Sequence, residues 1–239
     1  MITHQEYYTN RLYLLQDGIM EIVKNLNTPF YLTGGTALTR CYLQHRYSDD
    51  LDFFVNADED YHRYVGMILG ELRRHQSAHT FTFHADAVIA EEYYSQIVVS
   101  RKIEGDECML KIDLINDVAE HFGDINFIAP FGRVDNILNI LSTNKLTALY
   151  RFEPKDIADI WIISGHTQFQ WKEMVRWAKE KELGMDVLKI SEIIKSFPMD
   201  HVDAIKWAMP VDKEKMTEDL GIIADDILWG KANSLAPLV

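Results

Sequence analysis

Three aspartates stand where two predicted strands could place their carboxylates on one face. Asp50 and Asp52 are two residues apart in the segment DLDFFV, and Asp113 lies between Ile112 and Leu114 in the segment MLKIDLIND. Side chains two apart on a strand share a face, so the two carboxylates of DLDFFV are expected to point the same way. Carboxylates held together repel each other unless a cation lies between them. Hard oxygen ligands of this kind suit Mg²⁺ or Mn²⁺, and the pattern indicates a divalent-metal site.

A solvated acidic strand edge is the alternative interpretation of these carboxylates. The apolar neighbours Leu51, Phe53 and Val55 count against it, because they are expected to face a core. Asp113 would supply the third carboxylate, which a two-metal phosphoryl-transfer site usually takes from a neighbouring strand. A charge inside an apolar strand is unfavourable, and such a position is often functional.

A pair of glycines upstream of the aspartates could bind phosphate. The run TPFYLTGG predicts a buried strand that ends at Gly34 and Gly35, and a helix is expected to start near Thr36. Free backbone N–H groups at a helix N-terminus attract anions, and glycine lets a phosphate approach without a Cβ in the way. Thr36 could cap the helix or offer its hydroxyl to the ligand. A plain tight turn is the alternative, and the Gly-Lys-Ser/Thr ending of a Walker P-loop is absent.

The elements that must position these residues divide the chain near its middle. Residues 5–26 are predicted as a long amphipathic helix, and short β-branched and aromatic runs follow it. We therefore expect an α+β domain over residues 1–130, with a mixed or antiparallel sheet of roughly four to six strands. Residues 131–239 are predicted to be almost entirely helical and to form a small bundle.

Composition and charge limit the class of protein. A hydrophobic fraction of 47% and a charged fraction of 26% are ordinary for a soluble globular protein, and no apolar run is long enough for a membrane span. No secretory signal is recognisable, and Cys41 and Cys108 are expected to be buried free thiols in a reducing cytoplasm. The net charge of −13 makes non-specific binding to nucleic acid unfavourable, so a nucleic-acid partner would need a local basic surface.

Two segments of the sequence resemble a known family. Gly-Gly-Thr-Ala-Leu, a helix and then RYSDDLDF are similar to the signature of AbiEii/AbiGii-type nucleotidyltransferases, the toxin-like branch of the polymerase-beta-like superfamily. The segment NKLTALYRFEPKDIADIW is similar to a later motif of that family. The positions that match the later motif are Lys145, Ala148, Leu149, Arg151, Lys155, Asp156 and Asp159. The resemblance implies an α+β polymerase-beta-like nucleotidyltransferase core followed by a helical domain.

The resemblance also implies roles for the residues around the glycine pair. Gly34, Gly35 and Thr36 would hold the triphosphate of a nucleotide. The superfamily commonly has serine after its glycine where this chain has Thr36, which keeps the hydroxyl. Arg46 and Ser48 are expected to shape the turn before the metal-binding strand, with a phosphate contact as the alternative and Ser48 kept among the candidate nucleotide-binding residues.

For the acidic residues, the resemblance implies metal binding and general acid–base catalysis. Asp50 and Asp52 would ligate Mg²⁺ or Mn²⁺. Asp113 would complete the metal site and orient or deprotonate the acceptor hydroxyl. The enzyme would then transfer a nucleoside monophosphate from a nucleoside triphosphate to that hydroxyl.

The later motif contributes further candidates from the helical half. Lys145 would reach the nucleotide phosphates, and Arg151 is expected to do the same. Asp156 either assists the chemistry or holds Lys145 or Arg151 in place. Asp159 is expected to form a structural ion pair with Lys155 or Arg151.

Several partners and functions stay open at this stage. The resemblance implies a cytoplasmic toxin of a toxin–antitoxin or phage-defence system, with RNA, tRNA or protein as acceptor, an antitoxin as partner and no membrane association. A nucleotidyltransferase that modifies a small molecule, such as an antibiotic, is an alternative that the acidic net charge favours. A non-catalytic binding protein with the same fold is the other alternative, although a scaffold has no need for buried like charges.

Overall fold

The computed structural model describes residues 2–77, 81–103 and 105–235. The chain forms two compact units, and neither is continuous in sequence. Unit 1 comprises Met1–Ala37, Tyr47–Ala119 and Ile125–Asp135, and unit 2 comprises Leu38–Arg46, Glu120–Asp124 and Asn136–Val239. The expected domain boundary after residue 130 therefore falls inside the last segment of unit 1.

Unit 1 contains a mixed sheet of eight strands among the described residues, where roughly four to six were expected. Its order is β3-β5-β6-β2-β1-β8-β7, with β4 paired to β5. Strand β2 runs parallel to β6 and antiparallel to β1, so it lies in the interior of the sheet. The strands are β1 Tyr31–Thr33, β2 Leu51–Asn56, β3 Thr82–Phe83, β4 Ile89–Ala90, β5 Tyr94–Ile103, β6 Asp106–Asp117, β7 Asn126–Ile128 and β8 Gly132–Val134.

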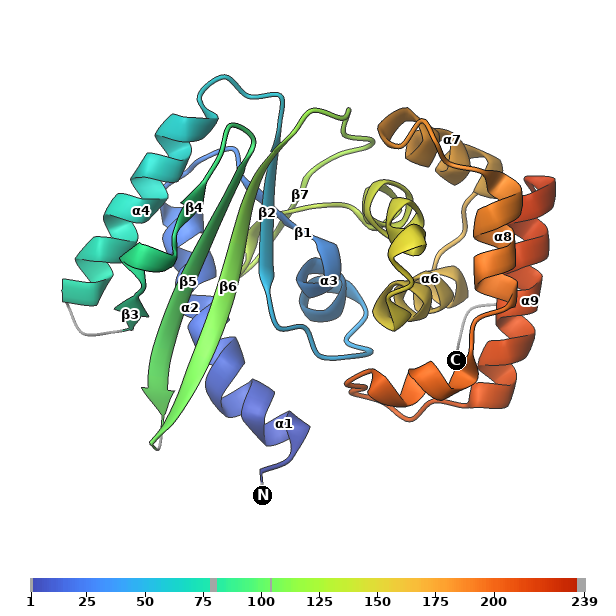
Figure 1. Ribbon diagram of the computed structural model, residues 1–239, viewed down its shortest axis with the longest axis horizontal. Coiled ribbons are helices and arrows are strands. Elements are labelled where there is room, and N and C mark those ends of the chain that lie inside the picture. The colour runs from blue at the N-terminus through green and yellow to red at the C-terminus, as the bar shows by residue number, and fades with distance from the viewer. Residues whose placement is uncertain (1, 78–80, 104, 236–239) are drawn as a thin grey trace. The chain divides into compact units, whose positions relative to one another are not determined.

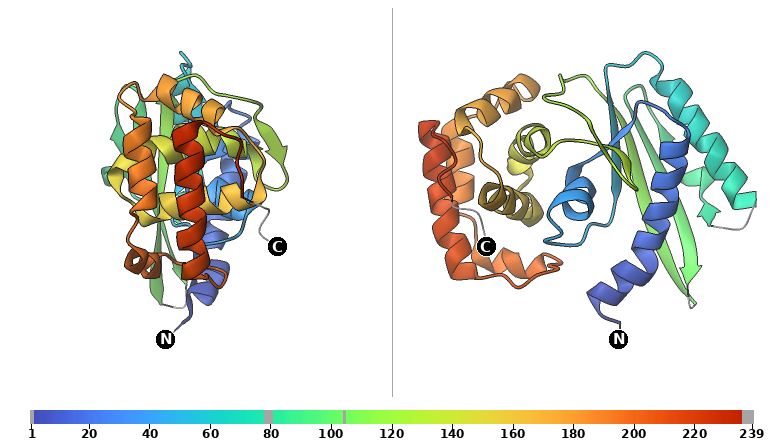
Figure 2. Two further views of the ribbon diagram at one scale, coloured as in Figure 1. Left: turned by 90° about the vertical axis from the view of Figure 1, so that its right-hand side faces the viewer. Right: turned by 180° about the vertical axis from the view of Figure 1, so that it is seen from behind.

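Two long helical segments cover one face of this sheet (Figures 1 and 2). The first is continuous from His4 to Asn25, which agrees with the helix predicted over residues 5–26. Its middle is a π-helical segment. The second is α4, Tyr61–Ser77. The first segment is made of α1 His4–Tyr7, η1 Tyr8–Leu12 and α2 Tyr13–Asn25. Ile19 and Ile68, from the two segments, are fully buried in the core.

Unit 2 is helical, as the sequence predicts. Pro154 begins α6 at a position where its missing N–H is not needed, and nearly every residue from Asp156 to Gly165 is buried, so α6 is the central helix of the unit. The helices of the C-terminal part are η4 Ile140–Leu146, α6 Pro154–His166, α7 Trp171–Lys181, α8 Val187–Lys195 and α9 Lys213–Trp229, with the shorter α5 Ile137–Asn139, η5 Leu149–Arg151 and η6 Met199–Ala204. In the described part of the chain, none of these helices has the length and hydropathy that a membrane span requires.

The two cysteines are free thiols in the structure. Cys108 on β6 is buried, as expected, but Cys41 is only half-buried. Burial raises the pKa of the Cys41 thiol to about 12, so the thiol stays protonated at neutral pH and is a poor nucleophile.

Candidate functional site

Asp52 and Asp113 lie side by side on the two central strands of unit 1. In β2, Leu51 and Phe53 are buried while Asp52 is half-buried, so the expected alternation of faces is present. The parallel register of β2 and β6 pairs Asp52 directly with Asp113. The two faces of β6 differ in the same way. Ile112 is fully buried in the core, whereas Asp113 bonds to side chains on the face that carries Asp52.

Gly34 makes room for one of these carboxylates. Its backbone has φ +67°, a left-handed conformation that favours glycine. A Cβ placed on Gly34 would lie 2.7 Å from Asp52 Oδ2, which is closer than van der Waals contact. The close approach that glycine permits on this side is therefore made by the carboxylate of Asp52. Phosphate binding by the backbone of Gly34 stays a prediction.

Thr36 links the glycine turn to the start of β2. The helix begins at Gly34, near the expected start at Thr36, but the residue before it is the extended Thr33, so the expectation that Thr36 caps the helix is wrong. Thr36 is fully buried in the first helical turn, and its hydroxyl donates to the backbone carbonyl of Asp50. The helix comprises α3 Gly34–Thr36 and η2 Ala37–Tyr42. This bond fixes the position of Asp50 relative to the glycines.

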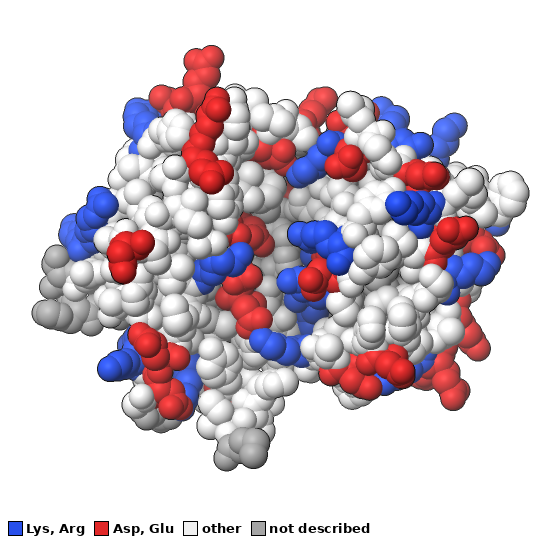
Figure 3. Space-filling model, in the orientation of Figure 1, with Lys and Arg blue, Asp and Glu red and all other residues white. Residues whose placement is uncertain are grey.

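A lysine ammonium lies against two of the three carboxylates. Lys111 Nζ is 2.7 Å from Asp113 Oδ2 and 3.7 Å from Asp50 Oδ2. Figure 3 shows acidic side chains gathered over β2 and β6 with a basic side chain beside them. Burial disfavours the charged lysine, but the hydrogen bond to Asp113 and the charge of Asp50 outweigh it and raise the pKa of Lys111.

Tyr94, on the neighbouring strand β5, completes the contacts of Asp113. Its hydroxyl donates to Asp113 Oδ1 over 3.0 Å. Burial and the nearby charge of Asp113 raise the pKa of Tyr94 to about 12, so the hydroxyl keeps its proton at neutral pH. The alternation of β6 predicts that Lys111 shares the face of Asp113, but no pattern in the sequence predicts its ion pairs or the contact of Tyr94. The position of Lys111 two residues before Asp113 was the available signal, whereas Tyr94 has no comparable one.

The carboxylates fit a cation by their chemistry but are not gathered into one coordination sphere. Within the described part of the chain, no group of three His, Cys, Asp or Glu side chains is close enough to hold a metal ion. Instead, the ammonium of Lys111 lies where Asp50 and Asp113 approach each other. Hard carboxylate oxygens suit Mg²⁺ or Mn²⁺, and a positive charge already lies among them.

The loop that leads into β2 is anchored on the first long helix. Gln16 Nε2 donates to the backbone carbonyls of Ser48 and Asp49, over 3.1 and 3.2 Å. The Tyr8 hydroxyl donates to the carboxylate of Asp49. Asp49 is thus bound to the first long helix and is not one of the metal-binding candidates. Ser48 is half-buried in this turn. Its phosphate contact stays a prediction.

Unit 2 contains a buried cluster of charges centred on Asp159. Arg46 binds both oxygens of Asp159 with two bonds of 2.7 Å, and Lys145 Nζ lies 2.7 Å from Asp159 Oδ2. The expected ion pair of Asp159 with Lys155 or Arg151 is therefore wrong. Burial opposes ionisation of Asp159, but Arg46 and Lys145 outweigh it and hold the pKa of Asp159 well below its ordinary value.

Asp156 binds the two basic residues of the later motif. Lys145 Nζ is 2.9 Å from Asp156 Oδ1, and Arg151 Nη2 is 3.0 Å from Asp156 Oδ2. Asp156 thus holds both cations, which is one of the two roles expected for it, while a part in the chemistry stays a prediction. The side chain of Lys145 is 7% exposed and that of Arg151 is 64% exposed. Of these two cations, only Arg151 presents its charge to solvent.

His45 joins the same cluster through one ring nitrogen. His45 Nε2 lies 2.8 Å from Asp159 Oδ1, and the side chain is fully buried. His45 Nδ1 has no hydrogen-bond partner among the described residues. A proton on Nδ1 would be buried without an acceptor, and this agrees with a pKa of His45 that burial lowers from its ordinary value. No local pattern in the sequence predicts a contact of this histidine with Asp159, because the two residues are 114 apart.

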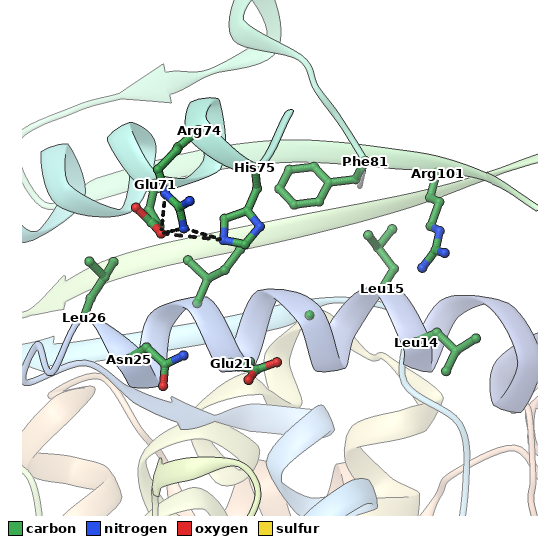
Figure 4. Close-up of a pocket in the computed structure, with 12 residues that line it drawn as sticks. Leu14, Leu15, Glu21, Asn25, Leu26, Glu71, Arg74, His75, Phe81 and Arg101 are labelled. Atoms are coloured by element: carbon green, nitrogen blue, oxygen red, sulfur yellow. Dashed lines mark hydrogen bonds and ion pairs between the residues drawn. The ribbon is translucent and has the colours of Figure 1, made fainter. Parts of the chain in front are cut away.

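A separate pocket of unit 1 lies beside the first long helix and α4 (Figure 4). Its volume is about 480 Å³, and His75 stacks on Phe81 at its wall. Arg74 in the same wall is paired with Glu71. None of the candidate catalytic or metal-binding residues lines this pocket.

Comparison with known proteins identifies the relatives of this chain. The profile of a family described as "Nucleotidyl transferase AbiEii toxin, Type IV TA system" matches residues 21–212. No curated protein matches the sequence. The fold is similar to a crystal structure described as a candidate nucleotidyltransferase from H. pylori, with 19% identity, a TM-score of 0.62, and coverage of 92% of this chain and 96% of that chain. It is also similar to JHP933 from Helicobacter pylori, with 19% identity, a TM-score of 0.58, and coverage of 96% and 94%.

Proposed function

The chain belongs to the AbiEii nucleotidyltransferase toxin family, and we propose that it transfers a nucleoside monophosphate from a nucleoside triphosphate to an acceptor hydroxyl with the aid of a divalent cation. The observation that carries the proposal is the parallel register of β2 and β6, which pairs Asp52 with Asp113 on one face. The cation beside Asp50 and Asp113 in this structure is an ammonium group, and it supports the view that this face takes positive charge.

Asp50, Asp52 and Asp113 are the residues that would hold Mg²⁺ or Mn²⁺. When bound, the ion neutralises negative charge on the phosphates of the nucleotide. The chain itself fixes the ligands. Thr36 holds the backbone of Asp50, and Gly34 leaves space for the carboxylate of Asp52. Positioning and charge neutralisation account for most of the catalysis in phosphoryl transfer.

The start of the helix that follows β1 would bind the triphosphate. Its first backbone N–H groups, at Gly34, Gly35 and Thr36, lie at the positive end of the helix dipole, which favours an anion. The Thr36 hydroxyl is already bonded to a backbone carbonyl, so we assign Thr36 a contact through its N–H. Ser48 is the additional hydroxyl proposed to contact phosphate.

The transfer itself breaks one P–O bond and forms another. The oxygen of the acceptor hydroxyl bonds to the α-phosphorus, and the bond from that phosphorus to the bridging oxygen breaks, so that pyrophosphate leaves with the electron pair. Asp113 is proposed to orient the acceptor hydroxyl and take its proton. Both of its oxygens are bonded in the structure, to Tyr94 and Lys111, and the acceptor hydroxyl would use a remaining lone pair of one of them.

The basic residues of unit 2 supply a second part of the proposal. Arg151 is proposed to offer its charge to a phosphate, because its guanidinium is exposed and held by Asp156. Lys145 stays a candidate for phosphate binding and catalysis, but its ammonium is buried and bonded to Asp156 and Asp159. Asp156 stays a candidate for a direct part in the chemistry.

We further propose that the enzyme is the toxin of a toxin–antitoxin system, with an antitoxin as partner and RNA, tRNA or protein as acceptor. Incubation of purified protein with each α-labelled nucleoside triphosphate, Mg²⁺ and cell extract tests this directly. Label recovered in RNA or in protein supports the toxin assignment. Label recovered only in a small molecule favours the antibiotic-type alternative.

The same assay tests the metal-binding residues. Asp52→Asn and Asp113→Asn are expected to lose label transfer and Mg²⁺-dependent nucleotide binding. Asp86→Asn serves as the matched control, because Asp86 is exposed on the short helix η3, Ala85–Ala87. Wild-type protein that binds no nucleotide and transfers no label with any extract would contradict the proposal.

A further inference from the structure

Both carboxylate oxygens of Asp113 are engaged by other side chains. Lys111 Nζ lies 2.7 Å from Oδ2, and the Tyr94 hydroxyl lies 3.0 Å from Oδ1. A divalent ion that binds Asp113 must therefore share its oxygens with these groups or displace one of them, and the ammonium is the one that repels it. The same ammonium lies 3.7 Å from Asp50 Oδ2, so it is close to two of the three proposed ligands.

The topology of the sheet keeps Lys111 in this position. Lys111 is two residues before Asp113 on β6, and alternate residues of a strand share a face. Leu51 of β2 pairs with Ile112 of β6, so Asp50, one residue earlier on the parallel strand, lies level with Lys111. The lysine side chain is 38% exposed and that of Asp113 is 11% exposed. The contact is thus more sheltered than an ordinary surface ion pair, and solvent screens it less.

We propose that Lys111 is a resident counter-ion of the metal-binding carboxylates, which holds them together when no divalent ion is bound and competes with that ion for their oxygens. The inference rests on the proposed function, because it takes Asp50, Asp52 and Asp113 to be the ion's ligands. The ammonium neutralises carboxylates that would otherwise repel each other. The same positive charge repels an incoming divalent ion at short distance.

Removing the positive charge of Lys111 is expected to raise the affinity for metal ions. Removing a residue that helps to bind the ion would lower it. Lys111→Gln removes the ammonium from beside Asp50 and Asp113. Mn²⁺ should then bind about tenfold more tightly than to wild type, a gain that corresponds to the loss of one nearby like charge. Lys111→Arg keeps the charge and should bind Mn²⁺ about as wild type does. Isothermal titration calorimetry with Mn²⁺ alone measures these affinities without reference to activity.

A matched control comes from the same hairpin. Lys102 is exposed on β5 and pairs with Glu107, which is six residues from Asp113 and so about 20 Å away along the strand. Lys102→Gln removes the same charge at that distance and should leave Mn²⁺ affinity within about twofold of wild type, because salt screens charges so far apart.

The thermal midpoint gives a second readout. In the presence of EDTA, the Lys111→Gln protein should have a lower thermal midpoint than the Lys102→Gln protein, because the carboxylates lose their counter-ion. With saturating Mn²⁺ this difference should shrink or reverse. A Lys111→Gln protein that melts like Lys102→Gln under both conditions overturns the counter-ion role even where both variants fold well.

The outcomes separate this inference from the proposed function. Wild type that binds Mn²⁺ no better than Asp52→Asn shows that the metal assignment itself fails. If wild type binds Mn²⁺ and Lys111→Gln binds it equally or more weakly, the inference about Lys111 fails alone. Loss of nucleotide binding in Lys111→Gln with unchanged Mn²⁺ affinity likewise overturns it, because Lys111 would then be a phosphate-binding residue only.

Discussion

Gly34 determines where the carboxylate of Asp52, a proposed metal ligand, can lie. Its φ of +67° is left-handed, and a Cβ at this position would lie only 2.7 Å from Asp52 Oδ2, so there is no space for a side chain. Gly34→Ala is therefore expected to lower the free energy of unfolding by about 1–2 kcal/mol through backbone strain. It should also weaken Mn²⁺ binding, because Asp52 must move. Urea unfolding and calorimetric titration measure the two effects.

Gly66→Ala is the control for this substitution. Gly66 lies exposed in α4, and nothing lies within 4 Å of the position that its Cβ would take. Alanine is the better helix former, so the variant should be more stable by about 0.5–1 kcal/mol and bind Mn²⁺ as wild type does. If the two alanine variants lose Mn²⁺ affinity equally, the close contact between Gly34 and Asp52 is not what positions the carboxylate.

At the scale of elements, Asp159 joins α6 to the segment that follows η2. Its carboxylate is fully buried and binds Arg46, Lys145 and His45. Asp159→Asn leaves two cations buried with one carboxylate fewer, and the expected loss in the free energy of unfolding is about 3–5 kcal/mol. Urea unfolding at neutral pH measures it.

A surface ion pair of the same unit provides the comparison. Lys195 and Asp225 lie 3.1 Å apart with both side chains more than half exposed. Asp225→Asn should change the free energy of unfolding by no more than about 1 kcal/mol. Equal effects of the two asparagine variants would show that the buried cluster contributes no more than a solvated pair.

His45 gives the cluster a dependence on pH. Burial lowers its pKa in the folded protein below the ordinary value of about 6.5, so below that pH the unfolded chain binds more protons than the folded one. The free energy of unfolding should therefore fall as the pH decreases from 7.5 to 5.5, through the pKa of the unfolded histidine. His45→Gln can keep a donor to Asp159 and should show a smaller decrease. Urea unfolding at the two pH values checks this, and equal decreases in wild type and variant would contradict it.

The sequence predicts the central strands and misses this cluster for physical reasons. The alternation of Leu51 and Phe53 with aspartates predicts β2 and its face, because the period of a strand is local. The pairing of Arg46 with Asp159 joins residues 113 apart in the sequence, and no local pattern encodes it. The additional strands are short, of two or three residues such as β4 and β7, and no periodic signal can develop over that length.

At the scale of the whole molecule, unit 2 depends on residues from the first part of the chain. Residues 38–46 belong to it and carry His45 and Arg46 to Asp159. A fragment of residues 131–239 lacks this segment and should not unfold cooperatively in urea. The same fragment with residues 38–46 fused to its N-terminus through a Gly/Ser linker should recover part of the cooperativity. Near-UV circular dichroism and urea titration compare the two, and a cooperative bare fragment would contradict the expectation.

The expected boundary after residue 130 follows from composition, because strand-like runs end there and helices follow. Composition cannot show that the helix after Gly34 leaves unit 1 at residue 38, since the amphipathic pattern of a helix does not reveal which core it joins. The candidate metal-binding residues were predictable because a short segment and one strand carry them. The strand period alone places Lys111 on the face of Asp113, whereas its contact with Asp50 and the place of Tyr94 depend on the sheet register.

The chain passes between the two units five times, at residues 37/38, 46/47, 119/120, 124/125 and 135/136. Genes of relatives that recombine at a single crossover near codon 130 would join a helical half to a foreign Arg46 and His45. Such a hybrid inherits Asp159 and Lys145 without the Arg46 and His45 they evolved with. Exchange of whole halves between relatives is thus disfavoured, and diversity in this lineage should accumulate by point substitution within each unit.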